Sequence, residues 1–475
     1  MRQQTWFFGC EYAFRTQRSV LLTFNSLALI APLSKTYLLV CNSMRNPLRL
    51  YFRQFVWARV IYFFFKRNII EKISLNQRFH GEVQSFTASR TEFYEPRLNL
   101  VIHSISKEDL FGGVTTSLHL FACMRQYFKH ARIILTDRTP KGEDLESYGE
   151  WTLDTNDGMQ TGNTIVSCEF RNGKPISIGP RDVFLSTSWW GSLTCVEVLK
   201  WQAAEYGDIA PKQFIYFIQD FEAGFYPWSS HYVLAEQSYR YPEQTIAAFN
   251  SHQLQTFMHT RGYRFLFEHV YAPKLHSKLA DQWHTYFPAG THHPRKKKIL
   301  IYGRADVSRN CFTIILDALR LLAGERDCRD WDFVSLGIQH ADVEHKHLKL
   351  ISLGKVSLPE YAAHMSEAYA GVSLMASPHP SYPPLEMAAF GVRVLTNDFD
   401  TRSMKQIARN IRSLDYCTPE NLKVALTEIM DTYHESPEGL FDEAFVEDYV
   451  AATATATASQ PVMPALAQAL VADLN

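Results

Sequence analysis

The chain is 475 residues long, which exceeds one ordinary hydrophobic core and suits two domains with an appendage. With 46% hydrophobic and 20% charged residues, its composition is that of a globular protein and excludes a disordered chain. The net charge of −1 combines a basic N-terminal stretch with an acidic remainder, and the acidic remainder argues against a polyanion-binding function for the whole protein. The eight cysteines include no Cys-x-x-Cys pair, which favours a reducing compartment and argues against structural zinc.

The first 80 residues stand apart in charge, with 12 Lys and Arg against only Glu11 and Glu71. The stretch "NPLRLYFRQFVWARVIYFFFKRNIIEKI" mixes basic and aromatic residues at spacings of an amphipathic helix. That pattern fits a helix packed on the body of the protein and equally an arm lying on an anionic membrane. No apolar run reaches the roughly 18 residues of a membrane span, and the N-terminus lacks a signal-peptide core. We therefore expect a cytoplasmic protein, at the inner face of the plasma membrane if the arm binds lipid.

From residue 97 onward, expected strands and helices alternate. In the first half the expected strands are 98–105, 131–136, 181–189, 212–218 and 244–250, with helices after Gly112-Gly113 and at 191–206 and 252–262. The stretch "PAGTHHPRKKK" (288–298) reads as a boundary. In the second half the expected strands are 299–303, 332–337, 348–354, 371–377 and 392–397, with helices at 311–325, 357–370 and 383–390. Ser357 and Glu360 predict a capping box at one helix start.

This alternation predicts an α/β fold of two Rossmann-like domains facing across a cleft. The expected divisions are a basic amphipathic extension (1–95), an acceptor-side domain (96–292), a donor domain (293–446) and a tail ending in a helix (447–475). Ligands of open parallel sheets bind at the carboxyl ends of the strands, so candidate site residues are sought there.

Two segments of the second half are suited to holding a nucleoside diphosphate. In "ILIYGRADVSRN" a strand ends at Gly303, and Arg304 and Arg309 follow on the loop. Their guanidinium groups can neutralise a diphosphate and stabilise it as a leaving group, although solvated surface arginines are the alternative. In "SPHPSYPPLEMAAFG" a loop leads into a short helix whose N–H groups can meet phosphate oxygens. Glu386 can accept hydrogen bonds from ribose hydroxyls there, although the helix dipole alone also favours it.

These motifs resemble the donor domain of GT-B glycosyltransferases of family 4. In that family Gly-Arg is followed five residues later by Lys; Arg304 matches the Arg, and Arg309 stands at the Lys position. The family also carries Glu-x7-Glu. Glu386 matches the second Glu, which contacts the ribose, but Pro378 stands where the first contacts the donor sugar. The resemblance leaves that contact to His379 or Ser381, or leaves it missing.

Together with "YFIQDFEAGFY", the motifs resemble a narrower group, bacterial rhamnosyltransferases of S-layer and cell-surface glycans that use dTDP-rhamnose. The resemblance implies a hexosyltransferase that transfers with retention, needs no metal or other cofactor, and binds a nucleotide sugar and a glycan acceptor that is lipid-linked or free. No nucleic-acid partner is expected. The implied donor-binding residues are Gly303, Arg304, Arg309, His379, Ser381, Tyr382, Pro383 and Glu386. The candidate catalytic residues are Arg304 and Arg309, at the matched motif positions, and Asp220, whose place after the strand "KQFIYFI" would let it orient the reacting hydroxyl.

The acceptor side is expected where "KQFIYFI" ends in polar and aromatic residues. The candidate acceptor-binding residues are Gly112, Gly113, Gln219, Asp220 and Glu222. The three polar side chains can accept hydrogen bonds from sugar hydroxyls, and Phe221, Phe225 and Tyr226 offer apolar surface to a sugar ring. Alternatively, Gln219 and Asp220 cap the backbone of the next segment.

Three other interpretations remain open at the level of the sequence. Asp398-Phe-Asp400 and Asp330-Trp-Asp332 each have the spacing of a metal-binding Asp-x-Asp of a GT-A enzyme. A GT-B nucleotide-sugar epimerase needs no acceptor cleft. A nucleotide-sugar-binding scaffold without turnover fits the loss of the glutamate at Pro378. A nicotinamide enzyme is disfavoured, because no Gly-x-Gly-x-x-Gly follows the first strand.

Overall fold

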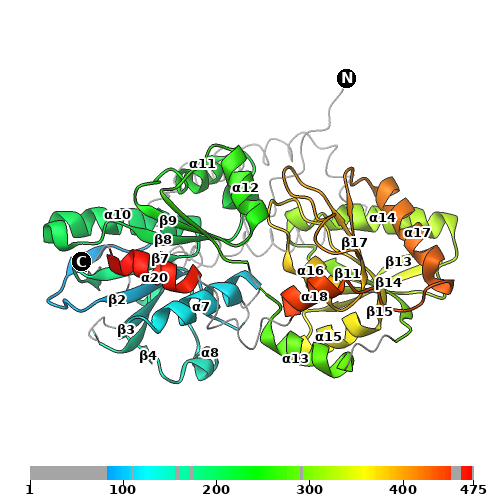
Figure 1. Cartoon of the computed structure of the whole chain (residues 1–475), viewed down its shortest axis with the longest axis horizontal. Helices are drawn as coiled ribbons and strands as arrows, with labels where there is room; N and C mark the ends of the chain where they lie inside the picture. The colour runs from blue at the N-terminus through cyan, green and yellow to red at the C-terminus, as the bar shows by residue number, and fades with distance from the viewer. Residues whose placement is uncertain are drawn as a thin grey trace, which may run out of the picture. The chain divides into compact units, whose positions relative to one another are not determined.

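The computed structural model of the chain describes residues 83–107, 109, 112–155, 161–171, 175–272, 274–288, 293–450 and 462–472 (Figure 1). The basic amphipathic stretch expected in the first 80 residues lies outside the described residues. None of the helices in the described part is both long and apolar enough to cross a bilayer.

The first half of the described chain forms an eight-stranded sheet in which every pair of neighbours is parallel. In sheet order the strands are β10 (Phe267–Val270), β9 (Thr245–Phe249), β8 (Phe214–Ile218), β7 (Asp182–Ser186), β2 (Arg97–Ile102), β3 (His130–Leu135), β5 (Asn163–Ser167) and β4 (Thr152–Leu153). On one side of β2 lie β3, β5 and β4, and on its other side β7, β8, β9 and β10 follow in chain order. The chain thus builds the sheet outward from β2 in both directions, which is a doubly wound arrangement.

The central strands of this sheet are buried along their whole length because both faces are covered. In β2, Val101 belongs to the core on one face, while Leu98 and Leu100 belong to the core on the other. The helices of this half are α7 (Gly112–Arg125), α8 (Gly142–Leu145), α9 (Cys168–Arg171), α10 (Trp189–Tyr206), α11 (Ser230–Gln237) and α12 (His252–Thr260). Short 3-10 turns are η4 (Glu146–Tyr148), η5 (Gly207–Ile209) and η6 (Glu222–Phe225).

The second half forms a seven-stranded sheet that is parallel except for one edge pair. In sheet order the strands are β13 (Val343–His345), β14 (Leu348–Gly354), β12 (Asp332–Gly337), β11 (Lys296–Gly303), β15 (Ala368–Val372), β16 (Arg393–Asn397) and β17 (Ile411–Leu414). Its helices are α13 (Ser277–Tyr286), α14 (Phe312–Glu325), α15 (Leu358–Glu367), α16 (Tyr382–Ala389), α17 (Pro419–Asp431) and α18 (Glu443–Val450), with 3-10 turns η8 (Ser308–Asn310) and η9 (Thr432–His434). Apolar residues of α14 and α17 cover one face, and those of α13, α15, α16 and α18 cover the other.

The last described helix, α20 (Val462–Ala472), packs on the first sheet rather than the second. Leu466 and Leu470 are fully buried in the core to which α7 also contributes. Figure 1 shows α20 in red next to α7 in cyan. The expected helix in the tail is therefore present. The domain limit expected between residues 446 and 447 falls inside α18.

Two expectations about the second half need correction. The helix expected over 357–370 ends at Glu367, and Ala368–Val372 is the central strand β15. The strand expected over 371–377 therefore begins earlier, and its second part is a loop. The capping box is confirmed, since the Ser357 hydroxyl accepts from the Glu360 N–H and the Glu360 carboxylate accepts from the Ser357 N–H.

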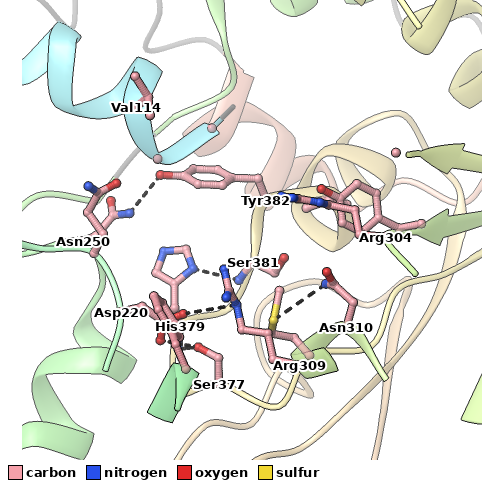
Figure 2. Close-up of a pocket in the computed structure, with 18 of the residues that line it drawn as sticks. Val114, Asp220, Asn250, Arg304, Arg309, Asn310, Ser377, His379, Ser381 and Tyr382 are labelled. Atoms are coloured by element: carbon pink, nitrogen blue, oxygen red, sulfur yellow. Dashed lines mark hydrogen bonds and ion pairs between the residues drawn. The ribbon is translucent and has the colours of Figure 1, made fainter. Parts of the chain in front are cut away.

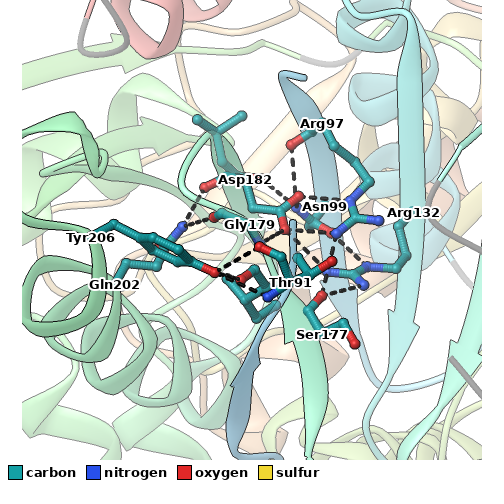
Figure 3. Close-up of polar contacts among 11 residues, drawn as sticks. Thr91, Arg97, Asn99, Arg132, Ser177, Gly179, Asp182, Gln202 and Tyr206 are labelled. Atoms are coloured by element: carbon teal, nitrogen blue, oxygen red, sulfur yellow. Dashed lines mark hydrogen bonds and ion pairs between the residues drawn. The ribbon is translucent and has the colours of Figure 1, made fainter. Parts of the chain in front are cut away.

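A buried ion cluster lies near the strand starts of the first sheet (Figure 3). The Asp182 carboxylate accepts from Nε and Nη2 of Arg97, both at 2.7 Å, and lies 3.6 Å from Nη2 of Arg132. Asn99 and the Gly179 N–H also donate to it. Both arginines donate to the Ser177 carbonyl in β6 (Ile176–Ile178), which pairs with β1 (Ala88–Arg90). The cluster therefore anchors this small two-stranded sheet to the main one.

Candidate functional site

A cavity of about 600 Å³ opens where the carboxyl ends of strands from both sheets meet. Its wall includes residues that directly follow β2, β7, β8 and β9 of the first sheet and β11 and β14 of the second, together with the last two residues of β12. The volume is within the range of small-molecule sites, and the position at strand ends is where doubly wound sheets bind ligands. Twelve of the candidate residues line it, namely Gly112, Gly113, Gln219, Asp220, Glu222, Arg304, Arg309, His379, Ser381, Tyr382, Pro383 and Glu386.

The two arginines reach the cavity from the loop after β11 (Figure 2). Gly303, which ends that strand, does not line the wall; a Cβ at Gly303 would lie 1.9 Å from the Ser335 hydroxyl. The glycine thus lets β11 pass close to β12, and Arg304 begins the exposed loop. Arg304 forms a 3.7 Å ion pair with Asp306. Arg309 lies in η8, and its carbonyl accepts from the Ala376 N–H at 2.7 Å.

The start of α16 is strained and points into the same cavity. Ser381 has φ of 69°, a left-handed conformation that costs free energy in a residue with a side chain. Pro383 supplies the fixed φ that suits a first helical turn. Farther along this helix, burial raises the pKa of Glu386 to about 7, although the Tyr361 hydroxyl opposes that rise. A ligand hydroxyl that donated to Glu386 would favour its charged form.

His379 is buried at the base of the loop before α16. Its Nδ1 accepts from the Ser381 N–H at 3.0 Å, which leaves the proton of the neutral ring on Nε2. Burial lowers the pKa of His379 to about 4, so the ring is neutral near pH 7. His379 therefore offers a neutral N–H donor and carries no positive charge.

Tyr382 joins the two sheets across the cavity. Its hydroxyl hydrogen-bonds to the Thr116 hydroxyl of α7 at 2.9 Å. It also accepts from Nδ2 of Asn250 at 2.9 Å, as Figure 2 shows. Its ring approaches Gly112 so closely that a Cβ there would lie 2.8 Å from the ring. Gly112 is thus required by this contact, and neither Thr116 nor Asn250 was identified from the sequence.

On the first sheet, the polar residues after β8 are mostly engaged by protein. Gln219 donates to the Ser117 hydroxyl at 2.9 Å, and a Cβ at Gly113 would lie 2.7 Å from its Oε1. Asp220 Oδ1 accepts from the Phe221 N–H at 2.8 Å and from the Ser377 hydroxyl at 2.5 Å. Asp220 therefore caps the backbone of the next segment, as one of the two interpretations of the sequence predicted. Its carboxylate also bonds to Ser377 in the second half of the chain.

Glu222 is the most deeply buried carboxyl group of the cavity wall. Its Oε2 accepts from the Trp189 N–H at 2.6 Å, at the start of α10. Burial raises the pKa of Glu222 to about 8; the Trp189 N–H opposes this and Asp220 adds to it. Glu222 is thus largely protonated at neutral pH and can donate as well as accept.

The aromatic residues of this segment divide between cavity and core. Phe225 and Tyr226 line the cavity together with Trp190, whereas Phe221 and Trp189 are core residues. The expectation that Phe221 faces a sugar is therefore wrong. Sequence reasoning also missed His103, Asp109, Tyr302, Tyr361 and Ser377 as wall residues, because their only signal is that they lie near the ends of strands or on adjacent helices.

The acidic triplets considered as metal sites lie away from the cavity wall. Asp400 forms an ion pair with Arg261 at 2.8 Å, and Asp330 forms one with Lys297 at 2.6 Å. Among the described residues, no three His, Cys, Asp or Glu side chains are grouped so that they could hold a metal ion.

Two family models match the chain in order. One is described as WsaF, N-terminal domain, and matches residues 97–252; the other is described as WsaF, C-terminal domain, and matches residues 297–427. Together the matches span more than half of the chain, and each covers most of one of the two main sheets.

The O-antigen biosynthesis protein RfbC of Myxococcus xanthus is 32% identical over 201 residues, which is 39% of this chain and 14% of that protein. The chain thus spans a small part of that relative's length. Among solved structures, the sucrose-phosphate synthase of Thermosynechococcus elongatus superposes with a TM-score of 0.50 at 12% identity, covering 79% of this chain and 99% of that one. This likeness concerns the fold, and the GT-B architecture expected from the sequence is confirmed.

Proposed function

We propose that this chain, which belongs to the WsaF family and has the GT-B fold, is a glycosyltransferase of cell-surface polysaccharide synthesis. The observation that carries the proposal is the convergence of Arg304, Arg309 and Glu386, from separate segments, on one cavity. Two guanidinium groups beside a carboxyl group match the needs of a nucleoside diphosphate, whose phosphates are anionic and whose ribose carries hydroxyl donors. The O-antigen function named for the M. xanthus relative agrees with this substrate class.

In the proposed reaction the bond between the sugar C1 and the diphosphate oxygen breaks, and a bond from an acceptor hydroxyl oxygen to C1 forms. The hydroxyl proton passes to the departing diphosphate, so no separate strong base is required. Arg304 and Arg309 would stabilise the charge that develops on the leaving group. The neutral His379 N–H would donate to the transferred sugar, in place of the glutamate that Pro378 replaces.

The finer assignments are part of the same proposal. The donor is dTDP-rhamnose, transfer proceeds with retention, and no metal takes part; these rest on the resemblance of the motifs to rhamnosyltransferases. The acceptor glycan would bind beside Gly113, Gln219 and Glu222. The chain would act in the cytoplasm, with the basic arm of the first 80 residues touching the inner membrane face.

A binding assay, followed by a transfer assay, tests the proposal. Isothermal titration with dTDP, UDP and GDP should show tightest binding of dTDP. Arg304→Ala and Arg309→Ala should each weaken that binding about ten- to hundredfold, because a charge-assisted hydrogen bond is lost. Arg320→Ala serves as the control, since Arg320 is exposed on α14 and does not line the cavity. Near-normal binding in both cavity variants would contradict the assigned site.

Transfer of label from dTDP-[¹⁴C]rhamnose to a rhamnose-containing acceptor would establish turnover. The scaffold alternative, which Pro378 favours, predicts tight dTDP-rhamnose binding without transfer. An epimerase would convert the nucleotide sugar with no acceptor present.

A further inference from the structure

We propose that Phe225 and Asp220, which belong to the first sheet's half of the molecule, position the Arg309 side chain for the diphosphate. This rests on the proposed function. The segment after β8 was expected to serve the acceptor; the geometry assigns it a second task, building part of the donor site.

Arg309 contacts both halves of the molecule, the second through its backbone and the first through its side chain. Its carbonyl accepts from Ala376 of the second sheet's half. Its guanidinium carbon lies 4.1 Å from the Phe225 ring centroid. Its Nε lies 4.0 Å from Asp220 Oδ2, and Figure 2 shows Arg309 and Asp220 in the same part of the cavity. Nε is buried and has no hydrogen-bond partner among the described residues, so the ring and the carboxylate are the contacts that orient it.

The two positioning residues are themselves fixed. Asp220 is held by the Phe221 N–H and the Ser377 hydroxyl. Phe225 ends the 3-10 turn η6, whose first residue, Glu222, is tied to the start of α10 through Trp189. A half-buried ring on a fixed turn presents its face to Arg309 with little freedom.

This arrangement suits a phosphate ligand. A guanidinium group stacked on a ring uses its π face for the ring and keeps its in-plane N–H donors for oxygen acceptors. Because the ring comes from the other half of the molecule, the arginine is complete as a diphosphate ligand only when both halves are in place.

The test is a double-mutant cycle read out by dTDP affinity in calorimetry. Phe225→Leu removes the ring and should weaken dTDP binding about three- to tenfold, whereas Phe225→Tyr keeps the ring and should restore it. In an Arg309→Gln background, Phe225→Leu should have no further effect. Trp228→Leu is the matched control, since Trp228 is 93% exposed, lies three residues on and does not line the cavity.

Each outcome supports or overturns the positioning role of Phe225. Equal losses from Phe225→Leu in both backgrounds, or no loss in the wild-type background, would overturn the positioning role while leaving the glycosyltransferase proposal intact. A wild-type protein that binds none of dTDP, UDP and GDP would overturn the proposed function and this inference together. If Phe225→Leu does not fold, as judged by thermal unfolding, Phe225→Met provides the same comparison.

Discussion

Glu222 gives the sharpest prediction, because its carboxyl group is enclosed by protein and its pKa is raised to about 8. An unfolded glutamate titrates near 4.5. Between pH 4.5 and about pH 8, Glu222 is protonated in the folded protein and ionised in the unfolded chain. The contribution of Glu222 to the free energy of unfolding therefore falls as the pH rises through this range, and it is constant above about pH 8. A difference of about 3.5 pKa units corresponds to at most about 5 kcal/mol.

Glu222→Gln removes this titration but keeps an oxygen that can accept from the Trp189 N–H. We expect the variant to resemble the wild type near pH 5 and to be more stable by several kcal/mol at pH 9. The measurement is urea unfolding at both pH values, followed by fluorescence and circular dichroism so that a domain intermediate is recognised. Other groups titrate equally in both proteins and cancel in the difference.

Glu197→Gln on the exposed face of α10 is the control, and its effect should not depend on pH in this range. A stability difference between wild type and Glu222→Gln that is the same at pH 5 and pH 9 would show that Glu222 is ionised throughout. The reasoning from burial would then be refuted.

Three further predictions concern the rest of the molecule. Tyr382→Phe removes the hydrogen bonds to Thr116 and Asn250, which should lower the free energy of unfolding by about 1–3 kcal/mol. The variant should also have a larger radius of gyration in small-angle scattering, and an unchanged radius would mean that other contacts hold the two halves together. Asp182→Ala removes the carboxylate that accepts from the buried Arg97, which should lower the free energy of unfolding by about 3–5 kcal/mol. The folded variant should keep its dTDP affinity, since the cluster lies at the ends of the strands opposite the cavity. Stability equal to that of the wild type would argue that water reaches the cluster. Transfer activity should survive EDTA, and loss with rescue by Mn²⁺ would contradict the metal-free reaction.

The alternation of apolar strands and helices was sufficient to predict the fold class. β12 and β14 have the bounds expected from the sequence, because polar or turn residues flank each apolar run. The error at β15 has a physical reason. Ala368 and Ala370 favour a helix, and no Gly or Pro separates them from the end of α15 at Glu367. Only burial between β11 and β16 therefore makes this segment a strand.

The donor motifs were predictable because Gly-Arg and the Pro-Pro helix start are local patterns. The contacts across the cavity were not, because they join residues far apart in the chain. Asp220 and Ser377 are 157 positions apart, and no local pattern pairs them. Likewise, the three-residue strands β1 and β6 exist only through their pairing, which joins Ala88 to Ile176.

The return of α20 to the first sheet bears on how such proteins can be recombined. Leu466 and Leu470 complete a core whose other members lie between Leu98 and Tyr271. A chimaera that took everything after one splice point from a homologue would import a foreign C-terminal helix into that core. Exchanging sugar-donor specificity by grafting therefore needs two junctions, one on each side of the donor module, with the native terminal helix retained.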